Sequence, residues 1–91
     1  MNTTYSLSKE EVLDRVKSRL EHFDIKTEEC TSEDKTVWSC KVLFRTELVG
    51  FINCIHRLGL QDEWSVLRHI AGVISSFSTT DFDEAIDYLM S

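Results

Sequence analysis

One ten-residue stretch constrains the fold more than any other part of the chain. Residues 36–45, TVWSCKVLFR, place apolar and polar side chains on alternate positions, with Trp38, Cys40, Val42 and Phe44 on one side. A period of two is typical of a half-buried strand. Because an isolated strand leaves its backbone hydrogen-bonding groups unpaired, this stretch predicts a sheet with at least one further strand.

The following segment, LVGFINCIHRL at 48–58, allows two interpretations. As a helix, it would carry an apolar stripe of Leu48, Phe51, Ile52, Ile55 and Leu58. Against this, the interior Gly50 would cost about 1 kcal/mol in a helix relative to alanine. Several of its side chains also favour strands. We therefore interpret 49–58 as a strand that pairs with 37–45 through a short turn at 45–47.

Three other elements are predicted from local patterns. Residues 9–23 form an amphipathic helix with Ser8 and Glu11 as a capping box. A short edge strand follows at 25–30, before a polar turn. A further helix is predicted at 62–77, because Asp62 is a good N-cap and apolar residues recur at helical spacing, namely Leu67, Ile70, Ala71, Ile74 and Phe77.

The last predicted helix, residues 80–90, is short, acidic and amphipathic. The preceding elements already supply faces for two packed layers. We therefore expect this helix to dock on a partner or to be exchanged between two copies. Packing on the core is the alternative. The predicted partner-binding residues combine an acidic side, suited to a basic protein, with an apolar side: Asp81, Phe82, Asp83, Glu84, Ile86, Asp87 and Leu89.

Charge and composition disfavour several classes of partner. The net charge is −6, and residues 46–91 carry two Lys/Arg against seven Asp/Glu. Nucleic acid and anionic membranes prefer concentrated positive charge, so neither is an expected partner. No apolar run approaches the roughly 18 residues of a membrane helix. Three cysteines without a secretory signal predict free thiols and a cytoplasmic location.

Cys54 and His56 are the candidate reactive pair, since they would share one face of a strand. Structural zinc sites usually show tight pairs such as C-x₂-C. A nucleophilic cysteine needs an orienting third group and an oxyanion hole. The sequence marks none of these features, so we predict no catalysis, metal or cofactor. Cys40 and Cys54 are instead expected to be buried and inert.

The opening helix EEVLDRVKSRL and the stretch VGFINCIHRLGLQDEWSVLRHIAGVISSF at 49–77 resemble the kinase-associated C-terminal domain. This α+β module ends several Ser/Thr kinases of the AMP-activated and microtubule-affinity-regulating groups. The resemblance implies a strand at 49–58 and a helix opening at 62–64. The family binds anionic phospholipid through basic residues, but only Arg57 and Arg68 lie in the matching half. The resemblance therefore implies that this chain docks to another protein domain.

These patterns predict a single α+β domain over residues 1–91. A small antiparallel sheet of two to four strands is packed by an N-terminal and a C-terminal helix, with a short acidic terminal helix. The predicted function is a non-catalytic regulatory module that binds a protein partner, and a homo-oligomer is compatible with it. Two alternatives stay open: a small thiol- or metal-dependent enzyme that uses Cys54 and His56, and an acidic mimic that occupies a nucleic-acid-binding surface.

Overall fold

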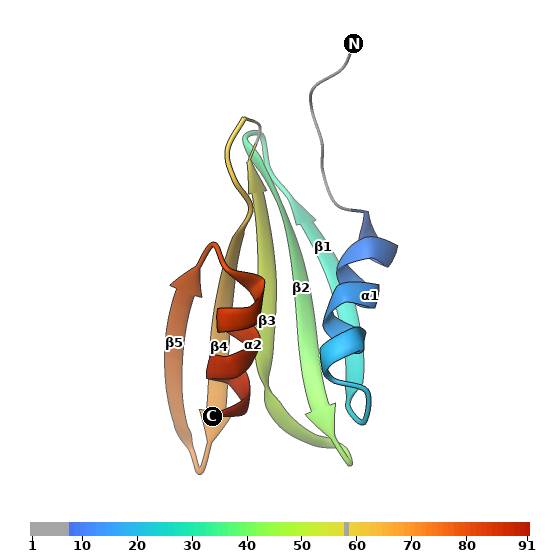
Figure 1. Cartoon of the computed structure of the whole chain (residues 1–91), viewed down its shortest axis with the longest axis vertical. Coiled ribbons are helices and arrows are strands. Elements are labelled where there is room, and N and C mark those ends of the chain that lie inside the picture. The colour runs from blue at the N-terminus through green and yellow to red at the C-terminus, as the bar shows by residue number, and fades with distance from the viewer. Residues whose placement is uncertain (1–7, 58) are drawn as a thin grey trace.

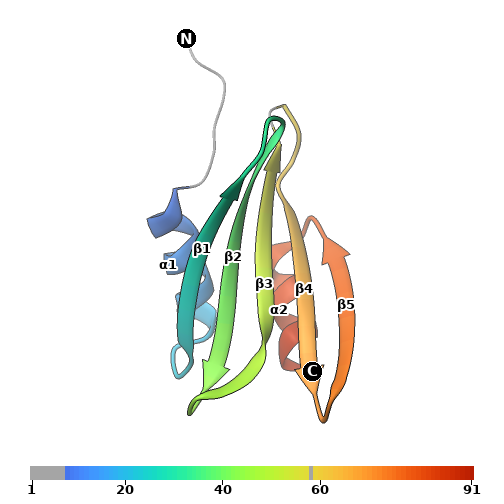
Figure 2. The same cartoon turned by 180° about the vertical axis from the view of Figure 1, so that it is seen from behind.

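A computed structural model, which describes residues 8–57 and 59–91, shows a five-stranded antiparallel sheet with two helices on one face (Figures 1 and 2). The strands lie in sequence order, β1-β2-β3-β4-β5. The predicted α+β class is confirmed, whereas the expected range of two to four strands is wrong. The elements are α1 (Lys9–Arg19), β1 (Asp24–Thr31), β2 (Lys35–Phe44), β3 (Glu47–Arg57), β4 (Glu63–Ile70), β5 (Val73–Thr79) and α2 (Phe82–Met90).

The pairing of β2 with β3 confirms the predicted hairpin. Trp38 lies opposite Cys54, and the register continues to the turn, with a single irregularity next to Val42. Position 58, the last residue of the predicted strand, lies outside the described residues. The two turn residues, Arg45 and Thr46, have φ angles of 52° and 69°. Positive φ at both central residues defines a type I′ turn, whose twist suits paired strands.

The predicted helix at 62–77 is wrong, because this segment forms the β4–β5 hairpin. β4 supplies the partner that the second edge of β3 requires, with Trp64 opposite Cys54. This long-range pairing overrides the local helical spacing of the apolar residues. The hairpin turns at Ala71 and Gly72, which both have positive φ. The helix opening implied at 62–64 by the resemblance is therefore a strand start.

The helices follow their capping signals. The Ser8–Glu11 capping box at the start of α1 is present in both directions. This helix ends at Arg19, four residues before the predicted end, and Leu20 is its C-cap. The predicted short terminal helix is confirmed as α2. Its N-cap is Asp81, whose side chain accepts hydrogen bonds from the backbone of residues 83 and 84.

The core lies between the helices and one face of the sheet. Its buried residues come from both helices and from β2, β3 and β4: Val12, Val16, Leu20, Cys40, Val42, Ile52, Cys54, Trp64, Val66, Ala85, Ile86 and Leu89. Gly50 of β3 lies beside Leu89 of α2. A Cβ atom there would sit 3.0 Å from Leu89 Cδ1 and 2.2 Å from the carbonyl oxygen of Leu67. This crowding accounts for a glycine inside a strand.

Candidate functional site

The structure places the apolar side of the predicted contact helix in the core. Ile86 and Leu89 are each 2% exposed. Phe82 is partly buried, and its ring centroid lies 4.7 Å from that of Trp64. The premise that residues 80–90 lie outside the core is therefore wrong. Because 62–77 forms strands instead of a helix, α2 is the element that covers the β3–β5 part of the sheet.

The carboxylates of α2 contact groups of the same chain. Asp83 and Asp87 both pair with Arg19 of α1, although their side chains stay 75% exposed. Glu84 accepts a hydrogen bond from the Thr79 hydroxyl at the end of β5. Exposed pairs of this kind are worth at most about 1 kcal/mol each, so they orient α2 more than they stabilise it. Recognition of a basic partner by this acidic side stays a prediction.

Two of the three thiols are buried on the helix-covered face of the sheet. Cys40 and Cys54 have no exposed surface, as predicted, whereas Cys30 on β1 is exposed. Burial raises the pKa of Cys40, and the hydroxyl of Thr27, 3.6 Å from its sulfur, partly offsets that rise. Burial, with a smaller effect from the Asp62 carboxylate, raises the pKa of Cys54 to about 12. Both thiols are therefore protonated at neutral pH, and only a thiolate is a strong nucleophile.

Cys54, His56 and Asp62 have the residue types of a nucleophile, a base and an orienting acid. The imidazole Nδ1 of His56 lies 2.6 Å from Asp62 Oδ1, which fixes the ring. His56 is two residues from Cys54 on β3, so both side chains start from the same face. Sequence reasoning missed the Asp62 contact because it treated Asp62 as a helix cap. The carboxylate raises the pKa of the thiol instead of lowering it, and the sulfur has no exposed surface.

Metal-binding side chains do not gather in the part of the chain that the structure describes. Within residues 8–57 and 59–91, no three His, Cys, Asp or Glu side chains are close enough to hold one ion. His69 lies on β4 near the β4–β5 turn and is exposed, away from Cys54 and His56.

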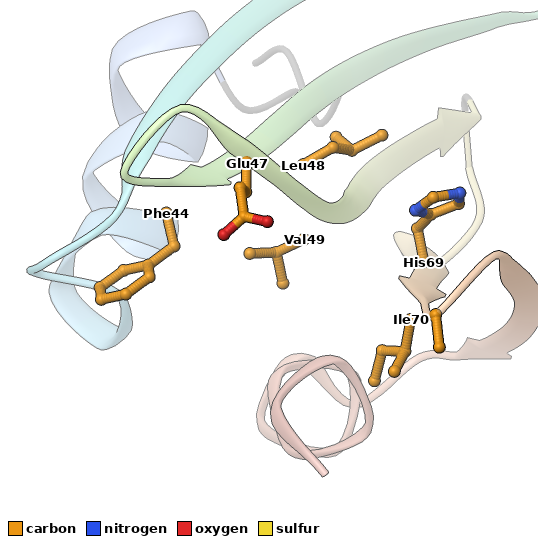
Figure 3. A pocket seen from close by; sticks show the side chains of 7 residues that line it. Phe44, Glu47, Leu48, Val49, His69 and Ile70 are labelled. Atoms are coloured by element: carbon orange, nitrogen blue, oxygen red, sulfur yellow. The ribbon is translucent and has the colours of Figure 1, made fainter.

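A shallow hollow of about 510 Å³ opens where the β2–β3 and β4–β5 hairpins end on the same side of the molecule (Figure 3). Phe44 and Val49 line one side, and Ile70 lines the other. Its ionisable side chains, Glu47 and His69, lie apart and do not converge on a common point (Figure 3). The hollow offers apolar contact area without the grouped polar atoms that usually orient a small ligand.

The second face of the sheet carries apolar side chains that neither described helix covers. On β3, Ile52 and Cys54 point under the helices, so the alternate residues Phe51 and Ile55 point to the opposite face. Figure 2 shows this face, on which neither described helix lies. Strand pairing sets Phe51 beside Leu67, and Ile55 beside Val37. We define the open face as the outward side chains of the three central strands: Lys35, Val37, Ser39, Lys41, Leu43, Leu48, Phe51, Asn53, Ile55, Arg57, Glu63, Ser65, Leu67 and His69.

Comparisons with protein-family models, curated proteins and solved structures found no match to the chain. No helix in the described ranges is both long enough and apolar enough to cross a membrane. Function is therefore inferred from the geometry of the chain itself.

Proposed function

We propose that this chain is a non-catalytic interaction module that binds a protein partner with the open face of its sheet. The observation that carries the proposal is the pairing of Phe51 with Leu67 at the centre of that face. Phe51 is half-buried and Leu67 is 36% exposed, although no described helix covers either residue. One face of an antiparallel sheet is often solvated, but it then usually carries polar side chains.

The arrangement of residue types on this face supports protein binding. Phe51 and Leu67 form an apolar, partly aromatic pair, as in the fully buried part of a protein–protein interface. A polar row of Ser39, Asn53 and Ser65 separates this pair from Val37 and Ile55. Charged side chains of both signs border the open face on the β1 side, where Lys26 lies opposite Lys41 and Glu28 lies opposite Ser39. A mixed rim of this kind selects a partner by charge pattern while the apolar side chains supply the contact area.

Two further observations favour a binding role over the alternatives. The buried, protonated Cys54 offers no accessible nucleophile, which disfavours a thiol enzyme. The α2 carboxylates are already engaged by Arg19 and Thr79, which weakens the acidic-mimic alternative. The resemblance to the kinase-associated C-terminal domain implies the same class of role, docking on another protein domain.

Substitution of the open face tests the proposal. Phe51→Lys and Leu67→Lys each place a charge at its centre, and Ser18→Lys adds the same charge on the exposed side of α1 as a control. Each immobilised variant is exposed to an extract of the source cell, and the retained proteins are quantified by mass spectrometry. We expect at least one protein to bind the wild type and the control but to bind both face variants about tenfold less, equivalent to about 1.4 kcal/mol.

Two controls make the result specific. The melting temperature of each variant shows that it is folded. Titration of the retained protein into the labelled chain should then shift amide signals of the β3 and β4 residues on the open face more than those of α1. Retention that is equal for all four proteins, or shifts confined to α1 and α2, would contradict the proposal.

A further inference from the structure

The two edges of the sheet differ in how they are protected. β1 carries Asp24, Lys26, Glu28 and Glu29, four charged residues among its eight. β5, VISSFST, has no charged residue and no proline. It also pairs with β4 residue by residue, without a bulge. Natural proteins use charges, prolines and bulges to keep sheet edges from pairing with other chains. β1 has this protection and β5 does not.

The backbone of β5 presents unpaired groups along its outer side. The two-residue turn makes Ile70 and Val73 a hydrogen-bonded pair. The hydrogen bonds of an antiparallel ladder alternate, so the N–H and C=O groups of Ile74, Ser76 and Ser78 point away from β4. α2 lies over the face of the sheet and does not cover this edge (Figures 1 and 2).

We propose that β5 pairs with β5 of a second copy of this chain, antiparallel and about a two-fold axis at Ser76. The two sheets then form one continuous sheet of twice the width. This register overlaps both strands completely and joins their outward groups in about six hydrogen bonds. The interface is isologous, because the same backbone groups of β5 donate and accept hydrogen bonds in both copies. The proposal goes beyond the proposed function and uses a different surface.

Side-chain sizes along β5 fit this self-pairing. In the two-fold register Ile74 lies opposite Ser78 of the second copy, Phe77 opposite Ser75, and Val73 opposite Thr79. Ile74 and Phe77 thus each meet a small serine, while Val73 and Thr79 are β-branched and of similar size, which allows close cross-strand packing. Val73 and Ile74 are 65% and 66% exposed in the single chain, so pairing would remove apolar surface from water.

Local charge does not oppose a second copy at this edge, although each chain carries a net charge of −6. No like charges face each other across the seam, because β5 has none. The Glu84 carboxylate accepts a hydrogen bond from the Thr79 hydroxyl at one end of β5. Two-fold symmetry places its counterpart at the opposite end of the seam. The remaining repulsion is long-range, so added salt should strengthen the dimer, as screening predicts.

Mass in solution tests the proposal on the full chain. Analytical ultracentrifugation should show the wild type at twice the 10.6 kDa of one chain. Ser76→Lys places two ammonium groups together at the axis and should shift the mass to 10.6 kDa. Glu28→Lys puts a lysine on the other edge strand, on the same face, and should leave the dimer intact. A wild type that stays monomeric at millimolar concentration would overturn the proposal, as would a dimer lost in Glu28→Lys but kept in Ser76→Lys.

Cross-linking gives a second readout that does not depend on the stability of Ser76→Lys. In a Cys30→Ser background, Ser76→Cys brings two thiols across the axis. The Cα atoms of a hydrogen-bonded antiparallel pair are about 5.5 Å apart, within the range that a disulfide spans. Mild oxidation should link Ser76→Cys quickly, whereas Glu28→Cys in the same background should link slowly. Equal rates would mean that the chains meet only by random collision. Because neither variant changes Phe51 or Leu67, failure here leaves binding at the open face standing.

Discussion

The two faces of the sheet are built from alternate residues of the same strands, yet they have different physical roles. On β3, Ile52 has no exposed surface under the helices, while Phe51, the preceding residue, is half-buried on the open face. The buried residues that form the core all belong to the covered face or to the helices. Folding therefore depends mainly on one face, and the other face can vary at little cost to the fold.

The largest predicted effect compares these two neighbours directly. Ile52→Ala leaves a cavity under the helices and should lower the free energy of unfolding by about 2–5 kcal/mol. Phe51→Ala removes a larger side chain, but water and small adjustments can fill the space, so we expect a loss of about 1 kcal/mol. Urea unfolding followed by circular dichroism measures both. A larger loss for Phe51→Ala would mean that the open face is part of the core.

The second prediction concerns Gly50 on the covered face, where an added side chain would meet both β4 and α2. Gly50→Ala introduces a Cβ atom 2.2 Å from the backbone oxygen of Leu67 and 3.0 Å from the side chain of Leu89. Backbone cannot move aside as a side chain can, so β3, β4 and α2 must separate, at about 1–3 kcal/mol or more. Gly59→Ala is a poor control because φ there is positive. Ser39→Ala on the open face is a suitable one and should change stability by less than about 0.5 kcal/mol.

Sequence patterns predicted the β2–β3 hairpin because two signals agreed there. The clean alternation of 36–45 required a partner strand, and Gly50 opposed a helix in the following segment. The structure gives Gly50 a more specific role, since it makes room for Leu89 of α2. That role depends on contact between residues far apart in the chain, which no local pattern reveals.

The β4–β5 hairpin was missed because its apolar residues satisfy both periods. Leu67, Ile70 and Ile74 fit a helical stripe, whereas in the structure they are at least 36% exposed. The turn was hidden because Ala71, the best helix-forming residue type, occupies a position that usually holds Asn or Gly. Gly72 and the β-favouring residues after it were the available signal. This error also led to the wrong position for residues 80–90. A helix at 62–77 would have covered the sheet, so the last helix was expected to lie outside the core.

The third prediction uses the thiols on the covered face. In the folded state the Cys54 thiol has a pKa of about 12 and stays protonated. In the unfolded chain its pKa returns to the ordinary value of 9.0. Above pH 9 the unfolded state therefore loses a proton that the folded state retains, and the free energy of unfolding falls as pH rises. Between pH 9 and 10 this contribution should be about 1 kcal/mol. Cys54→Val, which cannot ionise, should show a shallower decline in chemical denaturation across the same range.

Thiol labelling adds a kinetic control to the same comparison. A thiol reagent at pH 8 should modify the exposed Cys30 rapidly in the native protein and modify Cys40 and Cys54 only after unfolding. Mass spectrometry of the digested protein identifies the site. Rapid native labelling of Cys54 would contradict its burial and would restore the thiol-enzyme alternative.

The smallest predicted effect lies in the turns, where the chain passes from one strand to the next outside both faces. Ala71 has a φ of 52°, a left-handed conformation that costs a residue with a Cβ atom roughly 1 kcal/mol. Asn tolerates this conformation and, with Gly72, restores the preferred Asn-Gly type I′ turn. Ala71→Asn should therefore raise the free energy of unfolding by about 0.5–1 kcal/mol.

Thermal unfolding measures this gain. Ala85→Asn is the control, because the same change in the buried part of α2 should be destabilising. If Ala71→Asn lowers stability instead, residues 71–72 do not form this turn, and the division of 63–79 into two strands would itself be in question.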